Sequence, residues 1–292
     1  MVPNDSRLTL NNANQEALFS SRTVPSQCSE YHQAHLQVHL FGCFEVLCEG
    51  RTMPLCRNAR ALAILKYLLA YRTQRVSRDW LMDWLWPKAS PKRARSSLST
   101  AIYDLRCMLR SYSLPEEYAP HILLDREYYS LCPDLQVWTD VDEFESRYVE
   151  GLSLERTKRL PAAEAKYEEA VDLCRGDFLS EDLYEDWTVV ERERLRNAYM
   201  DALRRLSERY MATERYAEGV NACYKLLERD VYHEAGHFLL MCSYARLGLY
   251  SQALQHYHSY EQILKREFGA EPDTKIQGLR QKILRAESIE RQ

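Results

Sequence analysis

Cationic and hydroxyl side chains gather in one stretch of the sequence, residues 91–110, which reads PKRARSSLSTAIYDLRCMLR. Residues 88–110 contain six Lys and Arg residues and a single acid, Asp104. Arginine pairs with phosphates and with guanine, and small hydroxyls such as Ser96 and Thr100 can donate to phosphates or base edges without bulk. This chemistry suits a surface that approaches a polyanion, although a solvated basic helix would carry the same residue types.

The same stretch has the period of a half-buried helix, because its apolar residues fall on one side at roughly 100° per residue. We expect the opposite side to face base edges through Arg93, Ser96, Thr100 and Tyr103. We expect phosphate contacts from Lys92, Arg95 and Arg106, and from Arg126 at the tip of a later hairpin. The apolar positions are Ala94, Leu98, Ala101, Ile102, Leu105 and Leu109.

The segments around this helix must position it, and their order predicts a winged helix over residues 35–138. Such a fold places its third helix in the major groove and its terminal hairpin against the DNA backbone or the minor groove. Ser77 is a suitable N-cap for the second helix, and Pro87 stops that helix. The expected elements are two strands within residues 36–46, helices over 58–71, 78–86 and 91–110, and strands over 121–124 and 128–132.

Residues 139–292 carry only helical patterns and an internal repeat of 34 residues, which is the tetratricopeptide period. Leu206 and Leu240 are 34 residues apart, as are Tyr210 and Tyr244 and also Tyr216 and Tyr250. Small residues that allow close helix packing recur at Ala163, Gly219 and Ala253. The chain is therefore predicted to be an α+β winged helix followed by an all-α tetratricopeptide-like domain, with a plain α-bundle as the alternative for the second part.

The charge is divided unevenly between these parts. Residues 36–138 have 14 basic and 10 acidic residues, whereas residues 139–292 have 23 basic and 30 acidic residues. A basic part followed by an acidic part is expected when only the first part meets nucleic acid. Residues 1–34 are rich in Asn, Ser and Gln and are expected to be a disordered tail. Unpatterned cysteines, with neither a signal peptide nor a membrane span in the sequence, favour a cytoplasmic protein.

Two other kinds of chemistry were weighed. Residues 233–237 read HEAGH, which has the spacing of a zinc-peptidase helix, but this stretch lies inside a predicted repeat helix. No G-x-x-x-x-G-K-[ST] segment is present to bind a nucleotide phosphate. We therefore expect neither an enzyme nor a bound metal or cofactor.

Residues 38–109 (VHLFGCFEV…VSRDWLMDWLWP…ARSSLSTAIYDLRCML) resemble the winged-helix domain of Streptomyces antibiotic regulatory proteins. The segments WTDVDEF at 138–144, RGDFL at 175–179 and EFGAEP at 267–272 resemble the bacterial transcriptional activator domain that follows it in this family. One departure is Asp104 in Tyr103-Asp104-Leu105-Arg106, where family members often have a basic residue. It predicts an altered base preference or affinity.

The resemblance implies a transcriptional activator that binds direct repeats in promoter DNA as a homodimer and contacts RNA polymerase. The alternative is a helical interaction scaffold whose winged helix has lost DNA binding. We also expect a fragment of residues 35–138 to fold and recognise DNA without the helical part. The contrary possibility is that the helical part is needed to hold the winged helix in shape.

Overall fold

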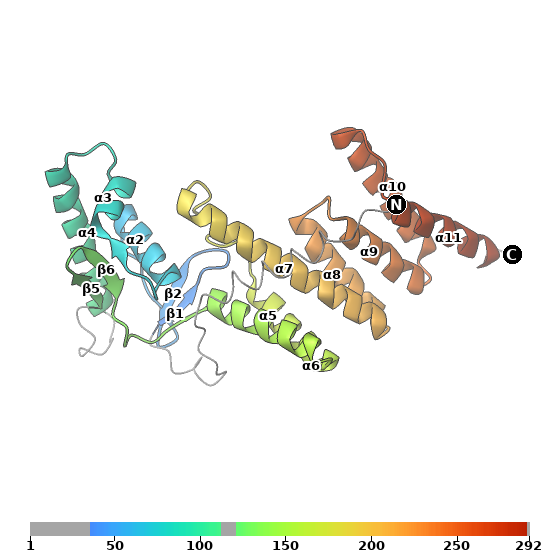
Figure 1. The fold of residues 1–292 in the computed structure, drawn as a ribbon, viewed down its shortest axis with the longest axis horizontal. Coiled ribbons are helices and arrows are strands. Elements are labelled where there is room, and N and C mark those ends of the chain that lie inside the picture. Colours follow the sequence, from blue (N-terminus) through green and yellow to red (C-terminus); the bar gives the residue numbers. More distant parts are fainter. Residues whose placement is uncertain (1–35, 112–120, 291–292) are drawn as a thin grey trace, which may run out of the picture. The chain divides into compact units, whose positions relative to one another are not determined.

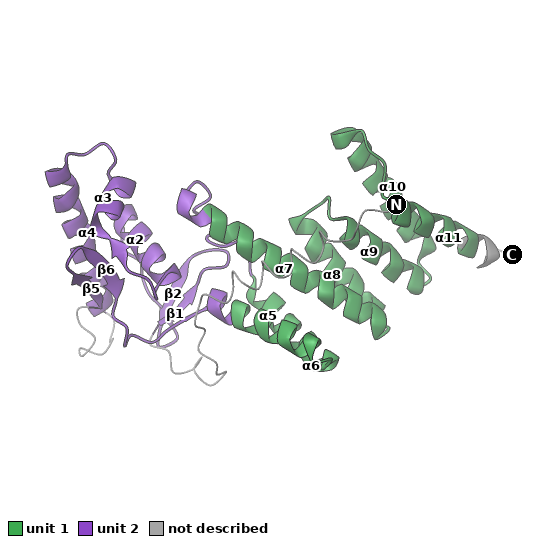
Figure 2. Cartoon of the chain, viewed as in Figure 1, with its two compact units in different colours: residues 1–20, 144–174, 189–292 green, residues 21–143, 175–188 purple. Residues whose placement is uncertain are grey.

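The computed structural model describes residues 36–111 and 121–290, so the expected tail at 1–34 lies outside the described residues. The chain forms two compact units, coloured differently in Figure 2. Within the described residues, unit 2 consists of 36–111, 121–143 and 175–188, and unit 1 consists of 144–174 and 189–290. The expected boundary after residue 138 therefore differs from this division, because residues 139–143 and 175–188 fold with the N-terminal part.

Unit 2 contains two small sheets and three helices, in the predicted order of strands, helices and hairpin (Figure 1). The antiparallel hairpin of β1 and β2 is joined by β3 on one side, and by β7, parallel to β1, on the other. The second sheet has the order β4-β6-β5. The elements of unit 2 are β1 (Leu36–His39), β2 (Glu45–Cys48), β3 (Arg51–Thr52), α2 (Ala59–Ala70), β4 (Val76–Ser77), α3 (Arg78–Leu85), α4 (Pro91–Arg110), β5 (Ile122–Asp125), β6 (Tyr128–Leu131) and β7 (Val137–Thr139).

The three helices of unit 2 pack through the apolar faces that the sequence indicates, with α4 against both α2 and α3. Leu65 of α2, Leu81 of α3 and Leu105 of α4 are each at most 1% exposed. Asn58 caps α2 by accepting a hydrogen bond from the Ala61 amide at 3.3 Å, and Ser77 precedes α3 as expected. Burial of these aliphatic faces fixes α4 against the rest of the unit.

Residues 175–188, from the second half of the chain, complete unit 2. The Leu179 amide donates to the Leu40 carbonyl at 2.7 Å, and the Gly42 amide donates to the Asp177 carbonyl at 2.9 Å. Phe178 is 2% exposed, and Trp187 packs its ring edge-on against Tyr67 with 5.2 Å between ring centroids. We name residues 175–188 the return segment.

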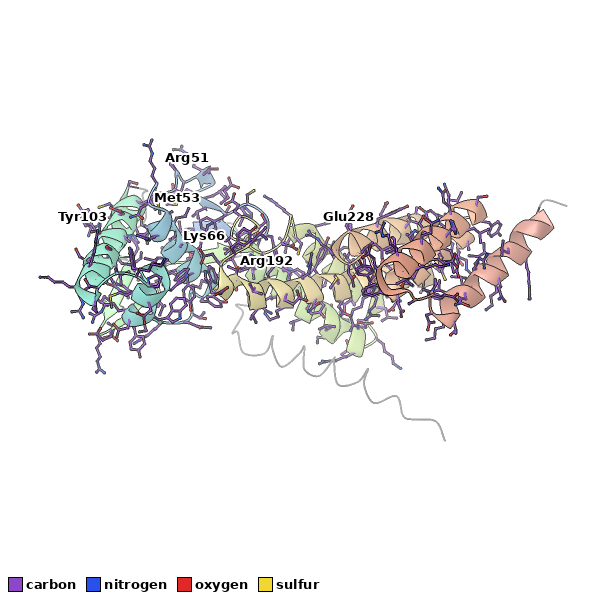
Figure 3. The ribbon with its side chains drawn as sticks, turned by 90° about the horizontal axis from the view of Figure 1, so that it is seen from above. Arg51, Met53, Lys66, Tyr103, Arg192 and Glu228 are labelled. Carbon is purple, nitrogen blue, oxygen red and sulfur yellow. The ribbon has the colours of Figure 1, made fainter. Side chains whose placement is uncertain are left out.

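The return segment also supplies the counterion of a buried lysine. Lys66 of α2, labelled in Figure 3, is 5% exposed, and its Nζ lies 2.5 Å from a carboxylate oxygen of Asp182. The start of α5 (Asp140–Arg156) makes a similar link, because the Asp140 carboxylate accepts hydrogen bonds from the Leu40 and Phe41 amides at 2.8 and 3.1 Å. Both links satisfy buried polar groups of the first half of the chain.

Unit 1 is all-helical and tetratricopeptide-like. Its helices stack in sequence, with α8 on α9, α9 on α10 and α10 on α11. Helices α5 and α7 begin in unit 2 and continue in unit 1. The elements are α5 (Asp140–Arg156), α6 (Leu160–Leu173), α7 (Asp186–Ala212), α8 (Tyr216–Arg229), α9 (Glu234–Arg246), α10 (Tyr250–Phe268) and α11 (Thr274–Glu290).

The repeat found in the sequence is also a repeat of backbone conformation. The residue two positions before α6, α8 and α10 has a positive φ in each case: 59° at Lys158, 61° at Glu214 and 73° at Gly248. The next amide then donates to the carbonyl five residues back, at 2.8–2.9 Å in all three turns. The predicted small positions Ala163 and Ala253 are at most 1% exposed. The same turn therefore starts three helices of unit 1.

Candidate nucleic-acid interface

Helix α4 separates an apolar face from a polar one, as its sequence predicts. Pro91 occupies the first turn, where a missing amide hydrogen costs nothing, and Ser90 is the N-cap. All six residues of the predicted apolar stripe are buried, which confirms the predicted orientation: Ala94, Leu98, Ala101, Ile102, Leu105 and Leu109.

The opposite face of α4 is exposed along its length. The four residues expected to read bases, Arg93, Ser96, Thr100 and Tyr103, are all exposed. Tyr103, labelled on α4 in Figure 3, is 67% exposed. A hydrogen bond with the Cys107 thiol raises the pKa of the Tyr103 hydroxyl above its ordinary value. This face can therefore offer cations and hydroxyls to a ligand at the same time.

The first turn of α4 adds a positive end to this face. It contains no acidic residue, and Lys92, Arg93 and Arg95 are exposed there. The unpaired amides of a first turn and the helix dipole both attract anions such as phosphate. The hydroxyls of Ser99 and Thr100 donate back to the carbonyls of Arg95 and Ser96, which leaves their oxygens able to accept.

The single acid of α4 points to a structural partner. The Asp104 carboxylate accepts a hydrogen bond from the side-chain amide of Asn58 at 2.9 Å. Asn58 is at the same time the N-cap of α2, so this pair links the start of α2 to the middle of α4. Asp104, the residue that departs from the related sequences, therefore has a role in positioning α4.

Arg106, expected to contact a phosphate, has a different partner in the structure. Its Nε and Nη2 both donate to the carbonyl oxygen of Ile122, at 3.1 and 2.7 Å. Ile122 starts β5, so the guanidinium joins α4 to the terminal hairpin. Sequence patterns did not indicate this role, because a main-chain carbonyl leaves no signature in residue types.

Arg126 lies at the tip of the β5–β6 hairpin and is exposed, as the hairpin predicted. Its φ of 54° is in the left-handed region, which non-glycine residues seldom occupy. The acids on either side of it have cationic partners: Asp125 pairs with Arg75 at 2.8 Å, and Glu127 pairs with Arg78. The hairpin tip therefore presents a cation whose neighbouring carboxylates are already neutralised.

The HEAGH segment has structural contacts. His233 caps α9 by accepting from the Gly236 amide at 3.1 Å. His237 is 2% exposed, and both of its ring nitrogens are engaged, one with His256 Nε2 and one with the Val231 carbonyl, each at 2.8 Å. This geometry gives both histidines of the segment a part in the packing of unit 1.

Comparison with known proteins places most of the chain among transcription regulators. The family model of the bacterial transcriptional activator domain matches residues 139–284. Transcriptional regulatory protein MoaR1 of Mycobacterium tuberculosis is 27% identical over 252 residues, which cover 86% of this chain and 79% of MoaR1. Regulatory protein DnrI of Streptomyces peucetius is 28% identical over 256 residues, covering 86% of this chain and 93% of DnrI.

A solved structure has a similar fold. Mycobacterium tuberculosis EmbR, determined in complex with a low-affinity phosphopeptide, matches with a TM-score of 0.70 over 86% of this chain and 65% of the EmbR chain. The two sequences are 22% identical, so this likeness concerns the fold. Within the described residues, no helix is long and apolar enough to cross a membrane.

Proposed function

Since the chain belongs to the bacterial transcriptional activator domain family and is a transcription regulator similar to the Streptomyces antibiotic regulatory proteins, we propose that it is a sequence-specific DNA-binding activator. In this proposal unit 2 is a winged helix, with α4 as the recognition helix in the major groove and the β5–β6 hairpin as the wing. The three packed helices followed by a hairpin support this assignment.

The observation that carries the proposal is the outward face of α4. Helix α4 combines a buried apolar face, which fixes the helix in unit 2, with an exposed face of arginines, a lysine and hydroxyls. The only acid of α4, Asp104, accepts a hydrogen bond from Asn58. A major groove admits one helix, and bases are read there by this combination of donors. Arg93, Ser96, Thr100 and Tyr103 then read bases, while Lys92, Arg95 and Arg126 contact phosphates.

We propose that the protein binds direct promoter repeats as a homodimer and that unit 1 contacts RNA polymerase. The resemblance to the antibiotic regulatory proteins supports both steps. Residues 144–174 and 189–292, which belong to unit 1, carry 22 acidic and 22 basic residues, so unit 1 has no net positive charge with which to hold DNA.

A gel shift and footprint on the DNA upstream of the protein's own gene test the proposal. Arg93→Ala should weaken binding to the preferred site by about 1–3 kcal/mol, and weaken binding to random DNA much less. Arg51→Ala is the matched control, because Arg51 is an equally exposed arginine of unit 2, on β3 rather than α4 (labelled in Figure 3).

Two results would count against this assignment. Equal losses from Arg93→Ala on the preferred site and on random DNA would assign Arg93 to the phosphates. Absence of any competitor-resistant shift by the full chain would favour an interaction scaffold whose winged helix does not bind DNA.

A further inference from the structure

A groove of about 630 Å³ lies on unit 2 between α2, α3 and the return segment. Its volume is within the range of sites that take a small ligand or a few peptide side chains. Aromatic, aliphatic and charged side chains line it. They include Ala59, Ala63, Trp80, Trp84, Tyr184 and Trp187.

Aromatic rings supply the groove with faces on which a cation can rest. The indoles of Trp80 and Trp84 are 5.0 Å apart between ring centroids, and Trp187 meets Trp84 edge-on at 6.1 Å. The Trp84 Nε1 hydrogen is taken by Glu185 at 3.0 Å.

The charges at the groove favour a cation over an anion. Three carboxylates line it, those of Asp83, Glu185 and Asp186, against one cation, Arg60. The Arg60 guanidinium is itself placed over the Trp86 ring, 5.2 Å from the centroid. Tryptophan faces flanked by carboxylates attract ammonium and guanidinium groups through cation–π and ionic contacts.

The surroundings of the groove indicate a protein rather than a small amine. Tyr184 is 97% exposed and Leu183 is 54% exposed, both on the return segment next to the groove. A small ligand inside the groove would leave these apolar side chains in water. A protein segment that crosses the groove can cover them, and interface hot spots are rich in Trp and Tyr of this kind.

We propose that this groove is a docking site for a cationic segment of a partner protein. A Lys or Arg side chain of that segment lies against Trp80 and Trp84 and pairs with the carboxylates of Asp83 and Asp186. The groove has the opposite charge to the outward face of α4. It would therefore repel DNA, and the inference does not depend on which sequence α4 reads.

The test begins with selection of random peptides displayed on phage against the full chain. Selected peptides are then synthesised and titrated while tryptophan fluorescence is followed. Every tryptophan of the chain lies in unit 2, so this signal reports on the unit that carries the groove. Butylammonium, titrated in parallel, shows whether a small amine is sufficient.

Two variants change exposed side chains that are proposed to bind the cationic segment. One is the charge reversal Asp83→Lys with Asp186→Lys. The other is Tyr184→Ala, which should not affect folding because the Tyr184 side chain is almost fully exposed. The matched control reverses two exposed acids of unit 2 outside the groove, Asp134→Lys with Glu49→Lys.

We expect the selected peptides to carry Lys or Arg beside an apolar residue. We expect their affinity to fall about tenfold or more in both groove variants and to change less than about twofold in the control. The proposal is overturned if selection yields no cationic consensus, or if groove and control variants bind the peptides equally. It is also overturned if butylammonium binds as tightly as the peptides, because the groove would then be a small-molecule site. DNA shifts of the same variants should be unchanged.

Discussion

Replacing Asp182 by Ala should destabilise unit 2, although Asp182 is 116 residues away from its partner Lys66 in the sequence. The Lys66 side chain is 6% exposed and its Nζ lies 2.5 Å from the Asp182 carboxylate. The same ammonium group lies 5.3 Å from the centroid of the Phe44 ring. Removal of Asp182 therefore leaves a charge buried among apolar and aromatic groups.

The size of the effect follows from the burial of the two partners. Breaking a fully buried ion pair by removing one partner costs about 3–5 kcal/mol, because the other charge is left without compensation. Here the Asp182 side chain is 24% exposed, and Glu181 remains 3.8 Å from Nζ. We therefore expect a loss of about 2 kcal/mol. Lys66→Met should cost less, about 0–1 kcal/mol, because an apolar side chain of similar length fills the site and Asp182 can be hydrated.

Urea unfolding followed by tryptophan fluorescence measures this loss, because all the tryptophans lie in unit 2. A loss of 2 kcal/mol lowers the unfolding midpoint by about 1 M for a slope of about 2 kcal/mol per molar urea. Glu181→Ala is the matched control, since Glu181 is a neighbouring acid, 54% exposed, at the longer distance from Lys66. It should change the free energy of unfolding by less than about 0.5 kcal/mol.

The double variant Lys66→Met with Asp182→Ala completes a mutant cycle. It should be more stable than Asp182→Ala alone, because no unpaired lysine remains. If Asp182→Ala and Glu181→Ala had the same small effect and the cycle gave no coupling, the return segment would not be an energetic part of unit 2. That result would refute the reasoning from Lys66.

Three further predictions concern other parts of the chain. A fragment of residues 35–138 lacks Asp140, Asp182 and Trp187, so its circular dichroism melt should be broad and its footprint lost; a cooperative melt would restore the expectation of independent folding. Arg106→Met, measured by urea unfolding and by binding at several salt concentrations, should cost about 1 kcal/mol of stability through the lost bonds to Ile122 and leave the salt dependence unchanged. A slope reduced by about one unit would instead show a phosphate contact. Burial lowers the pKa of His256 to about 4, below the ordinary 6.5, so the neutral ring stabilises unit 1 fully above pH 6.5 and this stability is lost as the pH falls toward 4. Far-ultraviolet circular dichroism melts should show this loss of stability between pH 6.5 and pH 4 in the protein and a smaller loss in a His256→Gln variant, and the same pH dependence in both would show that another group is responsible.

The sequence predicted α4 and its neighbours well because their signals are local. The apolar stripe from Ala94 to Leu109 repeats with the helical period, and Pro87 and Pro91 mark a stop and a start. Helices α8 and α10 likewise begin at Tyr216 and Tyr250, two of the positions that the 34-residue repeat relates. In each case the residues that determine the element lie within a few turns of one another.

The completion of unit 2 was not predicted, because it depends on pairs far apart in the chain. The bridge between Phe41 and Phe178 is made by main-chain groups, which any residue type can provide. Residues 137–139 pair in parallel with β1, whose register partners lie 101 residues earlier. Gly176 does carry a signal, because a Cβ there would come within 2.9 Å of the Gly42 Cα. A close approach of this kind requires glycine, but the sequence does not say which backbone approaches.

The family match and the folded unit therefore have boundaries at different residues. The match to the bacterial transcriptional activator domain begins at residue 139, yet residues 139–143 and 175–188 pack within unit 2. Asp140 satisfies two buried amides of the strand end at Leu40 and Phe41, and Asp182 neutralises Lys66. A cut at residue 139 would therefore leave the Leu40 and Phe41 amides and the Lys66 ammonium group without these partners. Within the stretch 139–188, residues 139–143 and 175–188 belong to the unit that is proposed to read DNA, and residues 144–174 belong to the unit that is proposed to contact the polymerase, so no single cut in the chain separates the two units.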